Sequence, residues 1–269
     1  MKQIQKISVC GLGKLGACIA ATLAARGFDV LGVDIDPEKV RCVNEGLPPV
    51  DEPLLARMSI ISAELTKISV NSFITMKISF TNQLRMIAEQ FPKADIHTIL
   101  DAIGSDSRIG QKYLKAGLSF GGPCFPRDNR LLAYTAKQAG VEAPLAEATD
   151  TVNQETNLDL VKKVQAQVNP KGTIAVLGIA YKPDTYITEE SAGLFLAQHL
   201  KRHGYRVLVH DFGAKPANAP ALHEFEYIAD PATLEQRDDI KVAVICCPWP
   251  QYRSVKFAGG TTVFTPWKI

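Results

Sequence analysis

The sequence predicts an α/β protein with three successive parts: a short N-terminal strand–helix–strand unit, a central all-helical part and a small C-terminal parallel α/β part. Three observations lead to this prediction. A buried strand at 7–10 runs into a glycine-rich turn, residues 59–91 form one long apolar helical stretch, and strands alternate with helices from 173 onward. Their order gives four segments: 1–56, 57–146, a connecting helix at 147–170, and 171–269.

The composition is that of an ordinary globular protein, with 46% hydrophobic residues, 22% charged residues and a formal net charge of +2 in 269 residues. This length suffices for two or three domains with their own cores, and no run of Lys and Arg is dense enough to follow a nucleic-acid backbone. The six cysteines include no CxxC pair, which favours a reducing compartment over a disulfide framework. With no signal-peptide pattern and no apolar run of membrane-spanning length, we expect a soluble, cytoplasmic protein.

The N-terminal unit carries a dinucleotide-binding fingerprint. The strand at 7–10 leads into a G-x-G-x-x-G turn, a helix follows at 17–26, and a second strand at 30–33 ends on Asp34. In this Rossmann-type arrangement the glycines admit a pyrophosphate to the helix N-terminus, and the acidic residue binds a ribose 2′-hydroxyl. A carboxylate with no arginine directly after it favours NAD over NADP. The predicted cofactor-binding residues are Gly11, Gly13, Lys14, Leu15, Gly16 and Asp34.

The same unit is incomplete as a Rossmann domain. A full fold of this kind has about six parallel strands in two halves, whereas this sequence offers two strands before it turns helical near Met58. Two parallel strands alone make no stable sheet, so their apolar faces are expected to lack neighbours. Either the natural protein has a further segment that is absent from this sequence, which we favour, or the chain is complete and impaired. An intact mass near 29.3 kDa would decide for the second.

The central part is predicted to be helical and to form a dimer. Residues 59–91 are apolar on nearly all faces of one long helix, more than the core of a single chain is expected to bury. Lys67 and Asn71 stand within it one turn apart. The ordinary explanation is a lysine whose head reaches solvent, but a lysine and an amide in an apolar helix also suit a polar target. Shorter helices are expected at 95–103, 128–140 and 143–168, before a break at 169–172.

A glycine-rich loop with a cysteine separates two of these helices. Gly121 and Gly122 precede Cys124, Pro126 fits the first turn of the following helix, and Asp128 lies one turn further on. A helix N-terminus favours thiolate over thiol, so Cys124 is a candidate nucleophile, and Asp128 is a candidate to hold a water or proton beside it. The alternative is a structural cysteine, although such a residue does not need glycines that let backbone approach a ligand closely.

The C-terminal part has a candidate ligand loop after its first strand. Residues 178–185 follow the strand at 173–177, at the carboxyl end where α/β sheets bind ligands, and Lys182 is the candidate anion contact. His199 and His203 have the i, i+4 spacing of a metal pair, but no third ligand is apparent and no metal is predicted. A helix is expected at 191–203, and further strands at 207–210, 242–246 and 262–264.

Together these motifs resemble the UDP-glucose/GDP-mannose dehydrogenase family. The matching segments are GLGKLG with VDID, SAELTKISVN, SRIG, GLSFGGPCFPRD, GIAYKPDT and the terminal TPWKI, in the family's order along almost the whole chain. The resemblance implies an N-terminal NAD domain, a central helical dimerisation domain and a C-terminal nucleotide-sugar-binding domain. It also implies oxidation of the C6 hydroxyl of a nucleotide sugar to the carboxylate with two NAD per turnover, UDP-glucose being the leading candidate.

The family's residue roles carry over by position. The resemblance implies that Cys124 traps the intermediate aldehyde as a thiohemiacetal, which a second hydride transfer turns into a thioester. Lys67 and Asn71 would stabilise the developing oxyanion, and Asp128 would assist proton transfer or position the hydrolytic water. Arg108 resembles the arginine that reaches the substrate of the neighbouring subunit. The implied substrate-binding residues are Arg108, Tyr113, Gly121, Tyr181 and Lys182.

Four departures from the family pattern leave alternatives open. The second half of the NAD domain, with its catalytic glutamate, is missing between Ala56 and Arg57. Glu189 stands where the family often has an arginine, which puts one cofactor contact in doubt. Tyr186 and Thr265 each stand where the family has an aspartate. One alternative is an impaired remnant that keeps the dimer scaffold and still binds nucleotide sugar. Another is a β-hydroxyacid dehydrogenase of the wider superfamily, which has no need of the cysteine loop.

Overall fold

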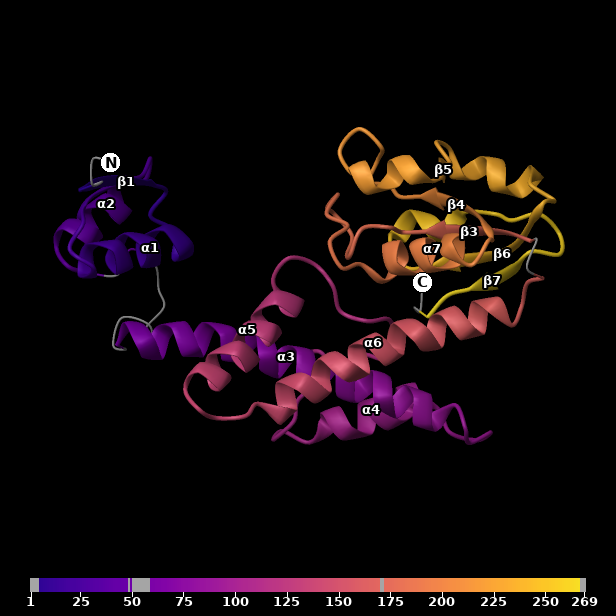
Figure 1. Ribbon diagram of the computed structural model, residues 1–269, viewed down its shortest axis with the longest axis horizontal. Helices are drawn as coiled ribbons and strands as arrows, with labels where there is room; N and C mark the ends of the chain where they lie inside the picture. Colours follow the sequence, from indigo (N-terminus) through magenta and orange to yellow (C-terminus); the bar gives the residue numbers. More distant parts are fainter. Residues whose placement is uncertain (1–4, 48, 50–58, 170–171, 267–269) are drawn as a thin grey trace. The chain divides into compact units, whose positions relative to one another are not determined.

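The computed structural model describes residues 5–47, 49, 59–169 and 172–266, and contacts divide the chain into two compact units, Met1–Lys67 and Ile68–Ile269 (Figure 1). The boundary between the units falls inside a long helix, and the division into four segments stays a prediction. The first unit contains strands β1 (Lys6–Cys10) and β2 (Asp29–Val33) and helices α1 (Lys14–Ala25) and α2 (Pro37–Asn44). The two strands pair in parallel, as the fingerprint predicted.

Two glycines of the turn between β1 and α1 are required by its geometry. Gly11 has a φ of +90°, and a Cβ on Gly16 would lie 1.6 Å from the carbonyl oxygen of Gly11. Only glycine tolerates both conditions, so the helix can begin close to the strand. α1 starts at Lys14, three residues before the predicted 17, because the turn itself supplies the first helical residues.

The apolar surface of the N-terminal sheet is open among the described residues. None of the five residues of β1 is buried, so the prediction of a buried strand is wrong in that respect. On β2, Leu31 is 64% exposed and Val33 is 46% exposed. Among the residues that the structure describes, the apolar side chains of these two strands are left open, as expected. The predicted gap between Ala56 and Arg57 lies outside the described residues.

Four helices form the first part of the second unit: α3 (Ile60–Ala88, which begins in the first unit), α4 (Ile96–Ser105), α5 (Phe125–Gln138) and α6 (Pro144–Gln165). α5 begins three residues before the predicted 128, because Pro126 needs no N–H partner in a first helical turn. The other helices fall close to their predicted ranges. No helix of the described chain is long and apolar enough to span a bilayer.

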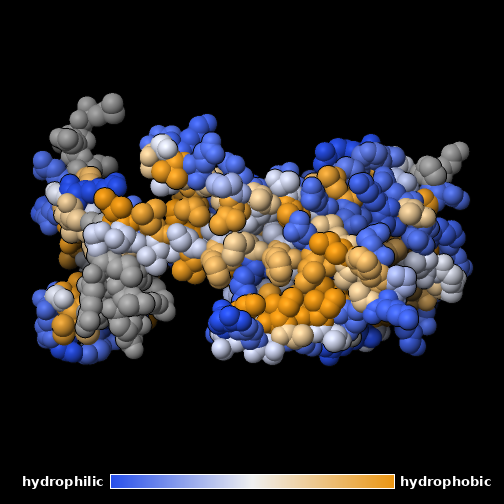
Figure 2. Space-filling view, turned by 90° about the horizontal axis from the view of Figure 1, so that it is seen from below, coloured by the Kyte–Doolittle hydropathy of each residue, from blue (hydrophilic) through white to orange (hydrophobic). Residues whose placement is uncertain are grey.

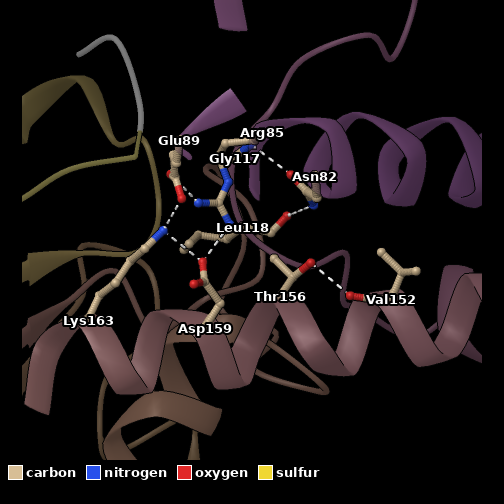
Figure 3. A network of polar contacts seen from close by, with 9 residues as sticks. All are labelled: Asn82, Arg85, Glu89, Gly117, Leu118, Val152, Thr156, Asp159 and Lys163. Atoms are coloured by element: carbon tan, nitrogen blue, oxygen red, sulfur yellow. Dashed lines mark hydrogen bonds and ion pairs between the residues drawn. The ribbon is translucent and has the colours of Figure 1, made fainter. Parts of the chain in front are cut away.

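Ion pairs join α3 to α6 (Figure 3). Arg85 of α3 lies 2.9 Å from Asp159 of α6, and Lys163 lies 2.8 Å from Asp159 and 2.6 Å from Glu89. Burial raises the pKa of Asp159, but the two cations outweigh burial and the net pKa is lowered. The carboxylate therefore stays charged between its partners, which fixes the two helices in register.

Apolar side chains of α3 remain open in the single chain. Ile61, Phe73, Phe80 and Ile87 are all exposed. Figure 2 shows apolar surface gathered along the part of the molecule that α3 and α4 occupy. One chain thus leaves much of this helix uncovered, as its sequence predicted.

The C-terminal part is a five-stranded, fully parallel sheet in the order β5-β4-β3-β6-β7. β3 at its centre is buried along its whole length, which explains its uninterrupted apolar sequence. Helix α7 (Ala192–Arg202) packs on the sheet, and its Leu196 and Leu200 are fully buried. The strands are β3 (Thr173–Leu177), β4 (Arg206–His210), β5 (Glu226–Tyr227), β6 (Ile240–Ile245) and β7 (Thr262–Phe264).

Candidate active site

Cys124 is the N-cap residue of α5, and its side chain is exposed. The N–H of Asp128 donates to the carbonyl oxygen of Cys124 over 2.8 Å, which closes the first turn of the helix. Phe125 anchors this turn, because its ring meets the rings of Tyr113 and Phe120 edge-on at centroid distances of 6.4 Å. Tyr113 itself has a φ of +64°. The thiol therefore sits at the exposed start of a helix whose next residue is held by aromatic packing.

Two asparagines hold the chain that leads into the cysteine loop. The amide of Asn82 on α3 donates to the Leu118 carbonyl over 2.9 Å, and its oxygen accepts from Gly117. Asn153 on α6 brackets Phe120 in the same way, over 2.8 and 3.0 Å. Each asparagine side chain bonds one backbone N–H and one backbone carbonyl of an irregular segment. The segment that precedes Cys124 is therefore held in place without regular secondary structure.

Asp128 is 4% exposed and receives hydrogen bonds from two sides. The Asn71 Nδ2 donates to it over 2.6 Å, and Arg127 donates its Nε over 3.0 Å. The bond to Asp128 raises the pKa of Arg127, and Cys124 adds a smaller contribution in the same direction. Arg127 thus lies beside both the carboxylate and the thiol. Arg127 was not among the site residues predicted from the sequence, although its place next to Asp128 was a usable signal.

The structure brings Asn71, Asp128 and the Cys124 turn together, from α3 and α5. Lys67 stands one turn before Asn71 on α3, with an exposed side chain. Arg108 lies in the loop after α4, 87% exposed, and pairs with Asp106, which raises the pKa of Arg108. The catalytic role of Lys67 and the inter-subunit role of Arg108 stay predictions.

The predicted ligand loop at 178–185 lies against the cysteine loop. A Cβ on Gly122, which has a φ of +83°, would lie 2.6 Å from the ring of Tyr181. The Lys182 ammonium is 5.6 Å from the centre of the same ring. Gly121 meets the backbone of Glu190, so both glycines of the cysteine loop are required by the approach of this second loop.

Asp211 organises the loops at the carboxyl end of the C-terminal sheet. It directly follows β4, is fully buried, and accepts hydrogen bonds from the N–H groups of Ala180, Gly213 and Ala214 over 2.7–2.8 Å. One carboxylate therefore ties the ligand loop after β3 to the loop after β4. Sequence reasoning missed this residue, although an acid at the carboxyl end of a parallel strand was the available signal.

The N-terminal turn has the features that a dinucleotide requires. Asp34 accepts hydrogen bonds from the N–H groups of Asp36 and Leu12, which lower its pKa and keep it ionised. Each oxygen keeps acceptor capacity for a ribose hydroxyl. A Cβ on Gly13 would meet nothing within 4 Å, so space is open above the helix N-terminus. Leu15 is exposed, and the side chain of Lys14 lies outside the described residues.

The two histidines with metal-like spacing stack on each other. The rings of His199 and His203 are 4.4 Å apart, and the His203 Nδ1 lies 2.8 Å from the His199 carbonyl oxygen. Within the described ranges, no cluster of three or more His, Cys, Asp or Glu side chains is arranged to hold a metal ion.

Comparison with known proteins gives the same assignment for all three parts. Profiles of the UDP-glucose/GDP-mannose dehydrogenase family match residues 5–99 (NAD binding domain), 61–155 (central domain) and 175–266 (UDP binding domain). UDP-glucose 6-dehydrogenase TuaD of Bacillus subtilis (strain 168) is 35% identical over 211 residues, which cover 77% of this chain and 45% of TuaD. The UDP-glucose 6-dehydrogenase of Rhizobium meliloti (strain 1021) is 31% identical over 237 residues, or 85% and 53% of the two chains.

A solved structure agrees with these matches. A UDP-glucose dehydrogenase from the hyperthermophilic archaeon Pyrobaculum islandicum superposes with a TM-score of 0.68 at 27% identity, over 97% of this chain and 55% of that one. The chain spans about half the length of the curated relatives it matches. With three domain profiles matched in order, the chain belongs to the UDP-glucose/GDP-mannose dehydrogenase family.

Proposed function

We propose that this protein is an NAD-dependent UDP-glucose 6-dehydrogenase, which oxidises the C6 hydroxyl of the sugar to the uronate carboxylate. The main support is the exposed Cys124 at the start of α5, one turn from a buried Asp128 that is bonded to Asn71. The ligand loop beside it belongs to the segment that matches the family's UDP binding domain. The names of the relatives support UDP-glucose as the substrate.

The chain's own residues account for the chemistry at the sugar carbon. When bound, NAD accepts a hydride in each of two oxidations. Cys124 adds to the intermediate aldehyde: the S–C bond forms, and the thiol proton passes to the aldehyde oxygen. Loss of that proton and of a hydride leaves a thioester, which water cleaves to the carboxylate and the free thiol.

Donors and a base surround this carbon. Asn71 uses one amide N–H for Asp128, so its second N–H is free to stabilise the oxyanion together with the Lys67 ammonium. Asp128 takes up the proton of the hydrolytic water, and Arg127 pairs with that carboxylate over 2.9 Å. Burial strengthens the hydrogen bonds that Asp128 accepts, because this carboxylate is 4% exposed.

The nucleotide would bind at the carboxyl end of the C-terminal sheet. Lys182 supplies a cation for the diphosphate, and Tyr181 offers a ring at the same loop. Asp211 keeps this loop in shape through the N–H of Ala180. Arg108 would reach the substrate of the second subunit in a homodimer formed through the exposed apolar side of α3. The six free cysteines suit a cytoplasmic protein.

A second candidate function is supported by the open N-terminal sheet. In the part of the chain that the structure describes, the two strands, with exposed Leu31 and Val33, offer the phosphate turn and Asp34 but no further strand beside the nicotinamide. A chain with this sheet alone would bind nucleotide sugar at Lys182 and turn over negligibly. The dehydrogenase and this impaired form share the dimer and the nucleotide site, and they differ in the cofactor site.

One experiment separates the two functions. Intact mass is measured first, and NADH formation is then followed with UDP-glucose, UDP-N-acetylhexosamines and GDP-mannose, together with UDP binding by calorimetry. NADH formation with UDP-glucose above the other sugars would support the dehydrogenase. UDP binding without NADH formation by a 29.3 kDa chain would support the impaired form. A chain that binds no UDP would contradict both.

A further inference from the structure

The cysteine loop and the loop after β3 interlock through their backbones. The Gly122 N–H donates to the Glu189 carbonyl oxygen over 2.8 Å. A Cβ on Gly121 would lie 2.3 Å from the carbonyl oxygen of Glu190, and one on Gly122 would overlap the Tyr181 ring. These contacts leave no room for either loop to shift alone. The position of Cys124 therefore depends on the loop that carries the nucleotide contacts.

Glu190 ties this loop to α5 a second time. Its carboxylate pairs with both terminal nitrogens of Arg130, which lies in the second turn of α5. One of the two contacts is 3.3 Å long and the other is shorter. The hydrogen bond to Glu190 is the main cause of a raised pKa at Arg130. Glu190 also has a φ of +50°, a conformation that few residues other than glycine adopt. Its backbone and its side chain thus both serve the contact with the cysteine loop.

The loop from 178 to 190 is closed on itself by hydrogen bonds. The Tyr181 N–H donates to the Ile187 carbonyl over 3.0 Å, and the Ser191 hydroxyl donates to the Ile179 carbonyl over 2.5 Å. A ligand held by Lys182 therefore acts on the Tyr181 ring, which touches Gly122. A continuous chain of contacts leads from the nucleotide site to the thiol.

We propose that Glu190 is a positioning residue, which couples occupation of the nucleotide site to the reactivity of Cys124. The proposal rests on the proposed function in that UDP binds at the loop 178–185. Glu190 pairs with Arg130 and packs its backbone against Gly121, and the preceding Glu189 carbonyl accepts from the Gly122 N–H, so that the segment 121–124 is held against that loop. Bound UDP limits the motion of the loop 178–185 and, through these contacts, the motion of the segment 121–124. The Cys124 thiol is then accessible to a reagent in solution less often.

The test measures alkylation of Cys124 by iodoacetamide near neutral pH, with and without saturating UDP. UDP lacks the hexose that is oxidised, so it leaves the space at the thiol empty and acts only through the loop. Peptide mapping follows Cys124, and the exposed Cys18 on α1 serves as an internal reference. In the parent, UDP should slow alkylation of Cys124 at least about threefold and leave Cys18 unchanged. Ion pairs of this exposure contribute up to about fivefold to an equilibrium. The UDP effect should therefore fall by about half or more in Glu190→Gln.

A matched control is available in the same domain. The Arg206–Glu226 pair, at 2.7 Å, has side-chain exposures of 55% and 46%, against 55% and 40% for Arg130–Glu190. Glu226→Gln should leave the UDP effect on Cys124 intact. The exchange of charges in Arg130→Glu with Glu190→Arg should restore the effect lost in Glu190→Gln, which a purely structural role does not predict.

The outcomes separate this proposal from the function it rests on. If calorimetry finds no UDP binding to the parent, both are overturned. If UDP binds but alkylation of Cys124 does not respond, or if Glu190→Gln and Glu226→Gln respond alike, the coupling is overturned and the nucleotide site stands. Should Glu190→Gln lose its folded far-UV spectrum, Arg130→Gln removes the same pair from the helix side and replaces it in the comparison.

Discussion

Lowering the pH from 7 to 4.5 should destabilise the C-terminal domain through His210. This histidine ends β4, is 2% exposed, and has its Nδ1 2.9 Å from the Tyr252 hydroxyl. The rings of Phe212 and Tyr227 pack against it. Burial lowers the pKa of His210 to about 4, with a contribution from Lys215 and opposition from two nearby carboxylates. The imidazole is therefore neutral in the folded protein.

The sign and size of the effect follow from the two states. In the unfolded chain a histidine titrates near pH 6.5, as in model peptides, whereas the folded protein holds His210 neutral down to about pH 4. Between these two pH values the histidine is protonated in the unfolded chain and neutral in the folded protein. The free energy of unfolding therefore falls as the pH falls. Above pH 6.5 the effect vanishes. At 1.36 kcal/mol per pKa unit the loss is about 2.5 kcal/mol by pH 4.5, and screening by water lowers it to about 2 kcal/mol.

Urea unfolding followed by the fluorescence of Trp249 measures this loss. Trp249 is buried and packs against Phe212 in the same cluster, so it reports the unfolding of this domain. The parent should lose about 2 kcal/mol between pH 7 and pH 4.5. His210→Phe, which keeps an aromatic ring but cannot titrate, should show a much flatter profile, and the exposed His223→Gln should keep the parent's slope. Equal slopes for the parent and His210→Phe would refute the reasoning.

Three further predictions concern the site and the dimer. Cys124→Ser should stop after the first oxidation with its fold intact, and turnover like the parent's would remove Cys124 from the mechanism. Gly122→Ala should cost about 1–2 kcal/mol from its φ of +83° alone and should alter alkylation of Cys124, because its Cβ overlaps a ring. Gly140→Ala has a φ of +72° and open space, so it should show the strain without the change in alkylation. Phe73→Glu on the exposed side of α3 should turn a dimer into a monomer in sedimentation at micromolar concentration, and a monomeric parent would contradict this.

Local signals in the sequence were sufficient for most elements. The strands at 173–177 and 262–264 were predicted residue for residue, because an apolar β-branched run between turn residues has few other structures to adopt. The start of α5 was predicted three residues late, at 128, although Pro126 had been assigned to the first turn of this helix. β5 escaped prediction because it consists of only Glu226 and Tyr227, an edge strand too short to show a period.

The residues of the candidate site also differ in how far the sequence alone could bring them together. Cys124 and Asp128 are one helical turn apart, so their proximity follows from the spacing alone. Asn71 is 57 residues from Asp128 in sequence, and only packing of α3 against α5 brings their side chains to 2.6 Å. The link from Glu190 to Arg130, across 60 residues, has no local signature, because both residues are ordinary surface charges when read singly.

The order of the C-terminal sheet bears on how the protein is made. β3 lies between β4 and β6, and β6 leaves the ribosome about 60 residues after β3. Synthesis proceeds at about 5–20 residues per second, so the edge of β3 that pairs with β6 stays unpaired for roughly 3–12 s. During that interval the nascent chain presents an unpaired parallel edge, the kind of surface that recruits other strands. We expect the yield of folded protein to depend on chaperone capacity and translation speed across residues 178–240.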